Sequence, residues 1–209
     1  MTVEVAESRV QPLAGTFHRM LRGVHHLVLN TDDMKKTVDF YSGVLGMPLV
    51  GAIRVEEGVG TGPENRGNPP FEEIRHYFFD MGRDALLAFF EMPKGAKEKG
   101  DRNALGAMQH VSFACGPKRH REVLERLKAN GTEITGGPLV SIPPAIVSFY
   151  FFDPNNIRLE IVCDPRNADE ENLDVIGSCR MNEAELRAEL AGISDDKAWI
   201  DAMIAAMSC

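Results

Sequence analysis

The chain repeats itself, and this internal repeat limits the possible folds more than any other feature of the sequence. The segment Val24–Leu29 (VHHLVL) resembles Met108–Phe113 (MQHVSF), and each has the alternating pattern of a short strand with a histidine at its third position. A second match joins Tyr77–Asp80 to Tyr150–Asp153, since both segments read YFFD. The sequence therefore predicts two tandem modules of similar structure.

Each module also carries one predicted helix. Apolar residues at helical spacing predict helices over Met34–Leu45 and Lys118–Asn130. The glycines that follow, Gly46 and Gly131, are typical of left-handed C-caps, and residues 31–33 offer side chains that cap the start of the first helix. A hairpin then closes each module, with strands over 77–80 and 86–90 in the first and over 150–153 and 158–162 in the second.

The repeat divides the chain into an N-terminal extension (1–22), a first module (23–95), a second module (106–165) and a C-terminal helical tail (166–209). The first module contains a Gly- and Pro-rich stretch, residues 58–70, which has no counterpart in the second module. This stretch is either a lid over a site or a surface insertion. The tail is expected to form one or two short helices that cover the core or a dimer interface.

Charge and composition exclude several classes of function. The net charge of -8, without a cluster of Lys and Arg, argues against a nucleic-acid partner. No apolar run approaches the roughly 18 residues that span a bilayer, and the N-terminus lacks a signal pattern, so we expect a cytoplasmic protein with no membrane partner. The four cysteines form no C-x-x-C pair and are expected to be reduced thiols rather than disulfides or zinc ligands.

Two repeated histidines and one carboxylate form a candidate metal site, His26, His110 and Glu160. Burying the Glu160 carboxylate in its apolar strand would cost of the order of several kcal/mol unless it is paired or bound to a metal. Two His and one carboxylate leave three coordination positions open, as in non-haem Fe(II) oxygenases, although Mn(II), Zn(II), Co(II) and Ni(II) accept the same ligands. An ion pair of Glu160 with Arg158 or another cation is the structural alternative.

Two other histidines are expected to lie outside this site. His25 precedes His26 and should face the opposite side of the strand, because side chains alternate along it. A register slip of one residue would make His25 the ligand, but the alignment of the repeats argues against such a slip. His120 lies among charged residues of the second helix and is expected to be solvated.

At these residues the chain resembles the vicinal oxygen chelate superfamily of glyoxalases, methylmalonyl-CoA epimerases, fosfomycin-resistance enzymes and extradiol ring-cleaving dioxygenases. The resemblance covers about residues 23–165, and its motifs are His26–Leu29 with Asp33, Phe40–Tyr41, Leu45–Gly46, Phe149–Asn156 and Leu159–Glu160. It implies an α+β fold in which two tandem βαβββ modules form a curled mixed sheet around a metal-containing cavity, followed by the helical tail.

The resemblance also implies which positions bind the metal. The ligand positions of the superfamily correspond to His26, Ala88, His110 and Glu160. Glyoxalases and epimerases usually fill all four positions, whereas extradiol dioxygenases use His, His and Glu and leave the fourth empty. Because this chain has Ala88 at the fourth position, it is more similar to the extradiol dioxygenases, and the resemblance implies Fe(II) as the cofactor.

Two further residues are candidates for catalysis. Extradiol dioxygenases often carry a tyrosine ten residues before the ligand glutamate, and Tyr150 stands at that position. Catechol-cleaving members also place a histidine near the end of the last strand of the first module, but the matching segment, Asp84–Leu87, has none. His76 is the nearest substitute, although strand alternation should point it away from Tyr77.

The leading hypothesis from the sequence is an Fe(II) dioxygenase whose partners are a small aromatic, catechol-like substrate and dioxygen, in a homo-oligomer. Phe89, Phe113 and Phe149 are candidates to line the apolar pocket for the ring. The second hypothesis is a glyoxalase- or epimerase-type lyase or isomerase, in which a bulge would bring Glu91 in as the missing fourth ligand. The third is a non-catalytic protein that binds small molecules in the same cavity.

Overall fold

The computed structural model describes residues 21, 23–56, 73–92, 100–142, 146–167 and 169–206. The Gly- and Pro-rich stretch 58–70 and nearly all of the predicted N-terminal extension lie outside these residues. Gly23–Cys179 forms one compact unit, which contains both repeats. The helices from Arg180 onward belong to a second unit and are described separately.

The first module follows the order strand, helix, three strands. Its elements are β1 (His26–Thr31), α1 (Met34–Val38), the π-helical segment η1 (Asp39–Val44), β2 (Leu49–Glu56), β3 (Glu73–Asp80) and β4 (Leu86–Glu91). The sheet has the strand order β1-β4-β3-β2, with β1 parallel to β4 and the other pairs antiparallel.

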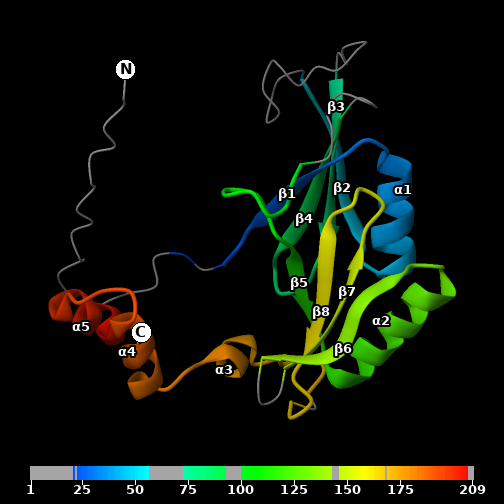
Figure 1. The fold of residues 1–209 in the computed structure, drawn as a ribbon. Coiled ribbons are helices and arrows are strands. Elements are labelled where there is room, and N and C mark those ends of the chain that lie inside the picture. The colour runs from blue at the N-terminus through cyan, green and yellow to red at the C-terminus, as the bar shows by residue number, and fades with distance from the viewer. Residues whose placement is uncertain are drawn as a thin grey trace. The chain divides into compact units, whose positions relative to one another are not determined.

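The second module repeats this arrangement. Its elements are β5 (Val111–Ala114), α2 (Pro117–Ala129), β6 (Ile134–Ile142), β7 (Ile146–Phe152) and β8 (Arg158–Cys163), and its sheet has the order β5-β8-β7-β6. Figure 1 shows α1 and α2 on the same side of the strands. The α+β fold with two tandem βαβββ modules is therefore confirmed, with each module building its own four-stranded sheet.

The predicted helix caps are present. The side chain of Asp33 accepts a hydrogen bond from the backbone N–H of Lys36 at 3.1 Å, which satisfies a donor at the start of α1. Gly46 and Gly131 have φ angles of 78° and 73°, a left-handed conformation that disfavours any residue with a Cβ. Local sequence signals thus set the start of α1 and the C-terminal ends of the helical segments in both modules.

One hydrophobic core joins the two modules, and it lies between the helices and the helix-facing sides of the sheets. Phe89 and Phe149 are fully buried in this core, and Phe113 packs against it. The prediction that these phenylalanines line a substrate pocket is wrong, because strand alternation turns them to the side opposite Glu160. A buried hydrogen bond of 3.1 Å from the Tyr41 hydroxyl to the Asp153 carboxylate also links the modules.

The register of the hairpins corrects the alignment of the two YFFD segments by one residue. In the first module Ala88 pairs with Phe78, and in the second Glu160 pairs with Tyr150. Phe78, rather than Tyr77, is therefore the structural equivalent of Tyr150. Tyr77 packs against the core instead, while the side chains at positions 76, 78 and 88 share the other face.

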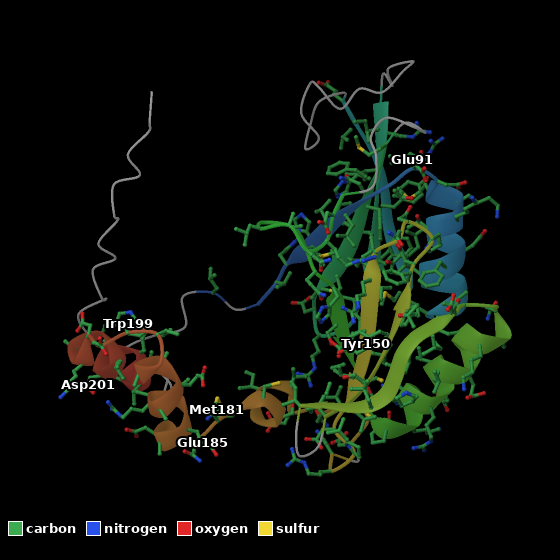
Figure 2. The ribbon with its side chains drawn as sticks, viewed as in Figure 1. Glu91, Tyr150, Met181, Glu185, Trp199 and Asp201 are labelled. Carbon is green, nitrogen blue, oxygen red and sulfur yellow. The ribbon has the colours of Figure 1, made fainter. Side chains whose placement is uncertain are left out.

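The C-terminal residues form helices, as predicted. α3 (Val175–Cys179) belongs to the unit of the modules, and α4 (Glu183–Ala191) and α5 (Lys197–Ala205) form the second unit. Asp196 caps α5, and an ion pair of 2.6 Å joins Arg187 on α4 to Asp201 on α5. Figure 2 labels Asp201. None of the helices that the structure describes is long and apolar enough to cross a membrane.

Candidate functional site

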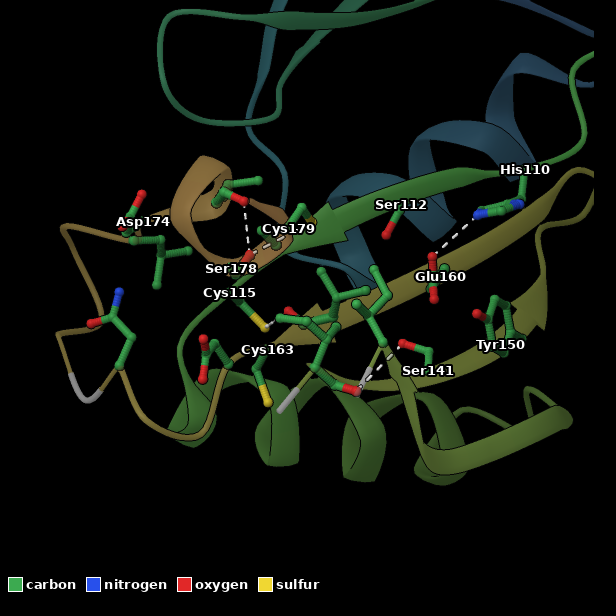
Figure 3. Close-up of a pocket in the computed structure, with 18 residues that line it drawn as sticks. His110, Ser112, Cys115, Ser141, Tyr150, Glu160, Cys163, Asp174, Ser178 and Cys179 are labelled. Carbon is green, nitrogen blue, oxygen red and sulfur yellow. Dashed lines mark hydrogen bonds and ion pairs between the residues drawn. The ribbon is translucent and has the colours of Figure 1, made fainter. Parts of the chain in front are cut away.

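His110 and Glu160, two of the three predicted metal ligands, lie side by side (Figure 3). The imidazole Nε2 of His110 is 3.1 Å from the Glu160 Oε2. The parallel pairing of β5 with β8 positions them, since Ser112 is the register partner of Glu160 and His110 directly precedes β5. Glu160 is only 6% exposed, whereas His110 lies at the surface, so the pair marks the mouth of a site.

The carboxylate of Glu160 keeps its charge despite its burial. Burial raises the pKa of a carboxyl group, but hydrogen bonds from Tyr150, Ser148 and Ser112 and the nearby His110 outweigh burial and lower the pKa of Glu160. An anionic oxygen beside an imidazole nitrogen is therefore available to a cation.

Tyr150 faces Glu160 from the neighbouring strand β7. Burial raises the pKa of the Tyr150 hydroxyl, and so do its hydrogen bond to Glu160 and the negative charge of that carboxylate. The hydroxyl therefore stays protonated and donates a hydrogen bond to Glu160. The guanidinium of Arg158 lies 4.5 Å from the centre of the Tyr150 ring. The group beside the Glu160 carboxylate is thus the imidazole of His110, whereas the guanidinium of Arg158 stacks on the tyrosine ring.

His26 lies at the start of β1 in the other module. Its side chain is exposed, its Nδ1 is 2.8 Å from the Nδ1 of His25, and its ring centre is 6.2 Å from that of Phe78. Within the described residues, no three His, Cys, Asp or Glu side chains gather closely enough to hold a metal ion. One copy of the chain therefore brings together His110 and Glu160, while the three-residue ligand set stays a prediction.

His76 shares the sheet face of His26 and is 5% exposed. Its ring centre lies 4.3 Å from that of Phe78 and 3.8 Å from that of Phe90. Burial, together with the charge of His26, lowers the pKa of His76, and its Nδ1 has no hydrogen-bond partner among the described residues. His76 is therefore a neutral imidazole in an aromatic setting, on the face opposite Tyr77, as strand alternation predicted.

The fourth ligand position of the first module is empty. Ala88 is buried, and β4 pairs with β1 and β3 without a bulge. Glu91 is held elsewhere: its Oε1 accepts a hydrogen bond of 3.0 Å from the backbone N–H of Met34, and its Oε2 pairs with Arg75. Figure 2 shows Glu91 beside the start of α1. The idea that a bulge makes Glu91 a fourth ligand is wrong for this structure.

Two serines that surround Glu160 were not among the predicted site residues. Ser148 is fully buried, and its Oγ lies 2.6 Å from the Oγ of Ser141. Ser112 projects from β5 beside Glu160 (Figure 3). The signal was present for Ser148, because it stands two residues before Tyr150 and so shares its face of the strand.

The residues present fit a divalent metal. Ligand atoms about 2.1 Å from a metal and at right angles to each other are about 3 Å apart, which matches the 3.1 Å between His110 Nε2 and Glu160 Oε2. The hydroxyls around Glu160 are the kind of outer hydrogen bonds that hold a ligand carboxylate in place. A third ligand has to come from outside this pair.

Comparisons with known proteins agree with this fold. The model of the glyoxalase/bleomycin resistance protein/dioxygenase superfamily matches residues 23–161. Similar solved structures are a glyoxalase/dioxygenase from Nostoc punctiforme (24% identity over 70% of this chain and 93% of that one, TM-score 0.51) and a glyoxylase/bleomycin resistance protein/dioxygenase domain from Frankia sp. EAN1pec (20%, 69% and 98%, 0.53).

A third structure is the fosfomycin resistance protein FosX from Listeria monocytogenes, complexed with Mn(II) and sulfate (20% identity over 69% of this chain and 93% of that one, TM-score 0.46). No curated protein sequence matches the chain. At these identities, the similarity to the Nostoc and Frankia structures shows the fold alone.

Proposed function

The chain belongs to the glyoxalase/bleomycin resistance protein/dioxygenase superfamily, and from this premise we propose that it is an Fe(II)-dependent dioxygenase that cleaves a catechol-like aromatic substrate. The observation that carries the proposal is the His110–Glu160 pair combined with an empty fourth position at Ala88. With Glu91 held by Met34 and Arg75, the ligand set of this proposal keeps three members, His26, His110 and Glu160. Such a set leaves room for both a chelating substrate and dioxygen.

In this proposal His110 and Glu160 hold the metal, and a bound Fe(II) supplies the redox chemistry that joins dioxygen to an aromatic diol. Glu160 stays anionic because Tyr150, Ser148 and Ser112 hydrogen-bond to it. Tyr150 presents a protonated hydroxyl beside the ligand pair. We propose that this hydroxyl orients one oxygen of the substrate and holds the proton that is exchanged with it.

We further propose that a second copy of the chain provides the third ligand, His26. His26 is exposed at the start of β1 and separate from His110 and Glu160, so an isologous homodimer in which each copy presents its first module to the second module of its partner would complete two equivalent sites.

Apolar side chains on the edge strands support such an interface. β2 and β6 each form one edge of their sheet, and each exposes three large apolar side chains at 39–57% of their surface: Leu49, Val50 and Ile53 on β2, and Leu139, Val140 and Ile142 on β6. Exposed apolar edges of this kind are typical of contact surfaces rather than of free monomers.

In the dimer, the face around His26 would add His76 to the site. His76 is neutral and has an unused ring nitrogen, so it is suited to accept a proton from the substrate. The aromatic rings of Phe78 and Phe90 beside it offer an apolar surface to the substrate ring. In this proposal His76, on β3, takes the acid-base role. The histidine that catechol-cleaving members place near the end of the last strand is missing from the first module.

Oxygen uptake tests the reaction. The full chain is loaded anaerobically with Fe(II), bound iron is measured, and catechols with different substituents are added in the presence of oxygen. We expect oxygen consumption together with a yellow ring-fission product. Iron-loaded protein that consumes no oxygen with any catechol would rule out the dioxygenase.

Mixing two inactive variants tests the shared site. His26→Ala and Glu160→Ala are each expected to be inactive, because each lacks one ligand. If the two are unfolded together and refolded, half of the dimers contain one copy of each variant and one intact site, so about a quarter of the wild-type activity should return. Failure to recover activity, in a sample whose mixed dimers are verified by mass, would contradict a site shared between copies.

A further inference from the structure

After the residues that match the superfamily, the chain continues with a segment that we call the strap, residues 164–167 and 169–179, which ends in α3. The strap belongs to the same compact unit as the modules. It lines one end of a pocket of about 470 Å³ whose other end is the His110–Glu160 pair (Figure 3). This volume lies within the range of about 300–1,000 Å³ that small-molecule sites occupy.

The strap is attached firmly to α2. The N-cap of α2 is Gly116, which has no side chain to cap the helix. Glu170 caps it instead, since its Oε1 accepts a hydrogen bond of 2.7 Å from the backbone N–H of Lys118. A Cβ on residue 116 would lie 2.3 Å from the Glu170 carboxyl carbon, so the glycine leaves room for this contact. Arg119 adds an ion pair of 2.6 Å with Glu171.

A second attachment joins the strap to the first module. The guanidinium of Arg83, in the turn between β3 and β4, donates a hydrogen bond to the backbone carbonyl of Leu173. Leu173 thus carries this attachment on its backbone, and its partly buried side chain lines the pocket. Because the strap is held at Glu170 and again at Leu173, it forms a defined wall.

The apolar lining of the pocket behind this wall includes Ala114, Ile146, Val162, Leu173 and Val175. No lysine or arginine occurs among the described residues that line it, whereas Asp164 and Asp174 stand at the strap end. Arg166 pairs with Asp164 at 2.6 Å, and the Asp174 side chain accepts a hydrogen bond from the backbone N–H of Gly177.

We propose that the strap makes this pocket a specificity site for an uncharged, apolar substituent of the substrate. The inference rests on the proposed function for the part of the substrate that chelates the metal. The substituent extends from the His110–Glu160 end along Val162 and Leu173 toward α3. A substituent that ends in a carboxylate or phosphate is excluded, because it would leave water without meeting a cation and would approach Asp174.

The test uses Zn(II)-loaded protein, so that binding is measured without turnover. Calorimetry compares catechol, 4-pentylcatechol and 4-(4-carboxybutyl)catechol, and then phenol and 4-pentylphenol, which have no vicinal oxygens. We expect the pentyl group to tighten binding by at least about tenfold with either head, since each buried methylene contributes. The carboxybutyl group, of similar length, should give no such gain.

Leu173→Asp should abolish the gain from the pentyl group, because it places a carboxylate in the apolar wall. Ile176→Asp is the matched control: Ile176 follows Leu173 by three residues, in α3, is 56% exposed and does not line the pocket, so this variant should keep the gain. Circular dichroism confirms that both variants are folded.

The possible outcomes separate the two proposals. A pentyl gain that Leu173→Asp removes supports the specificity site, even if iron-loaded protein consumes no oxygen and the dioxygenase is discarded. Equal binding of pentyl and carboxybutyl probes, a gain that survives Leu173→Asp, or no binding of any probe overturns the specificity site. Oxygen uptake with catechol but no pentyl gain would keep the dioxygenase and remove only the site for the substituent.

Discussion

The two modules share a topology but differ on the faces turned away from the core. In the second module the central positions are Glu160, Tyr150 and Ser148. The equivalent positions of the first module are Ala88, Phe78 and His76, as the pairing of the strands shows. At these positions one face is thus polar and anionic, while the other has two aromatic rings and no carboxylate.

This difference shows how a duplicated sheet can divide a task. A charged ligand needs hydrogen-bond donors around it, and the second module supplies them to Glu160. A substrate ring needs an apolar surface, which the aromatic face of the first module offers. Since each copy has one face of each kind, two copies can complement each other in the way that we propose.

The largest effect is expected when the anionic ligand is removed. Glu160→Ala should weaken Fe(II) binding by roughly 100-fold or more and abolish oxygen uptake, because the two remaining imidazoles alone hold the metal poorly. The reverse change at the equivalent position of the other module, Ala88→Glu, should retain metal binding. Titration of Fe(II) under anaerobic conditions measures both, and unchanged affinity in Glu160→Ala would refute the assignment of the ligand.

A smaller effect is expected from the tyrosine on the polar face. Tyr150→Phe should lower kcat by about 10–100-fold and leave the bound metal in place, since it removes a proton donor but no ligand. Phe78→Tyr at the equivalent position should change kcat much less. Oxygen uptake with metal analysis on the same samples distinguishes the two, and a wild-type rate in Tyr150→Phe would assign the residue to packing.

The aspartates of the two YFFD segments should differ in their effect on stability. Asp153 is buried and accepts hydrogen bonds from Tyr41 and from the backbone N–H groups of Asn155 and Ile157, whereas Asp80 is exposed and accepts one from Gly82. Asp153→Ala should lower the free energy of unfolding by about 2–4 kcal/mol, and Asp80→Ala by about 1 kcal/mol or less. Urea denaturation followed by circular dichroism measures both, and equal losses would contradict the difference in role.

The smallest effect concerns acid stability. His120 is buried against Phe149, and burial lowers its pKa, so the unfolded chain takes up a proton near pH 6.5 that the folded chain resists. Stability should therefore fall as the pH drops below about 6.5. His120→Leu should weaken this dependence between pH 7 and 5, as measured by thermal unfolding. A dependence that stays unchanged would mean that other groups, such as His76, dominate it.

The sequence predicted the fold well because the repeat is carried by local signals. Alternating strands, helical spacing and the glycines at positions 46 and 131 each act within a few residues, and all of them appear in the structure. The same signals failed for His120, which was expected to be solvated among charged neighbours but is buried. The packing of α2 against the second sheet, rather than the charge of the neighbouring residues, decides its environment.

The candidate site was predicted less completely, because its geometry depends on strand register and on contacts distant in sequence. The two YFFD segments look equivalent, yet a shift of one residue places Tyr77 and Tyr150 on different faces. The pair of His110 and Glu160 follows from the parallel pairing of β5 and β8, whereas His26 does not join that pair as a third ligand among the described residues. α3 was not distinguished within the predicted tail, since its five residues carry no helical period long enough to read.

The contact between Gly116 and Glu170 sets the shortest piece of the chain that we expect to fold well. A fragment cut where the superfamily match ends, at residue 161, would leave the first turn of α2 without its acceptor and the wall of the pocket missing. Recombinant fragments and domain fusions should accordingly extend to Cys179, because α2, which lies within the second module, is capped by Glu170, a residue that follows this module in the sequence.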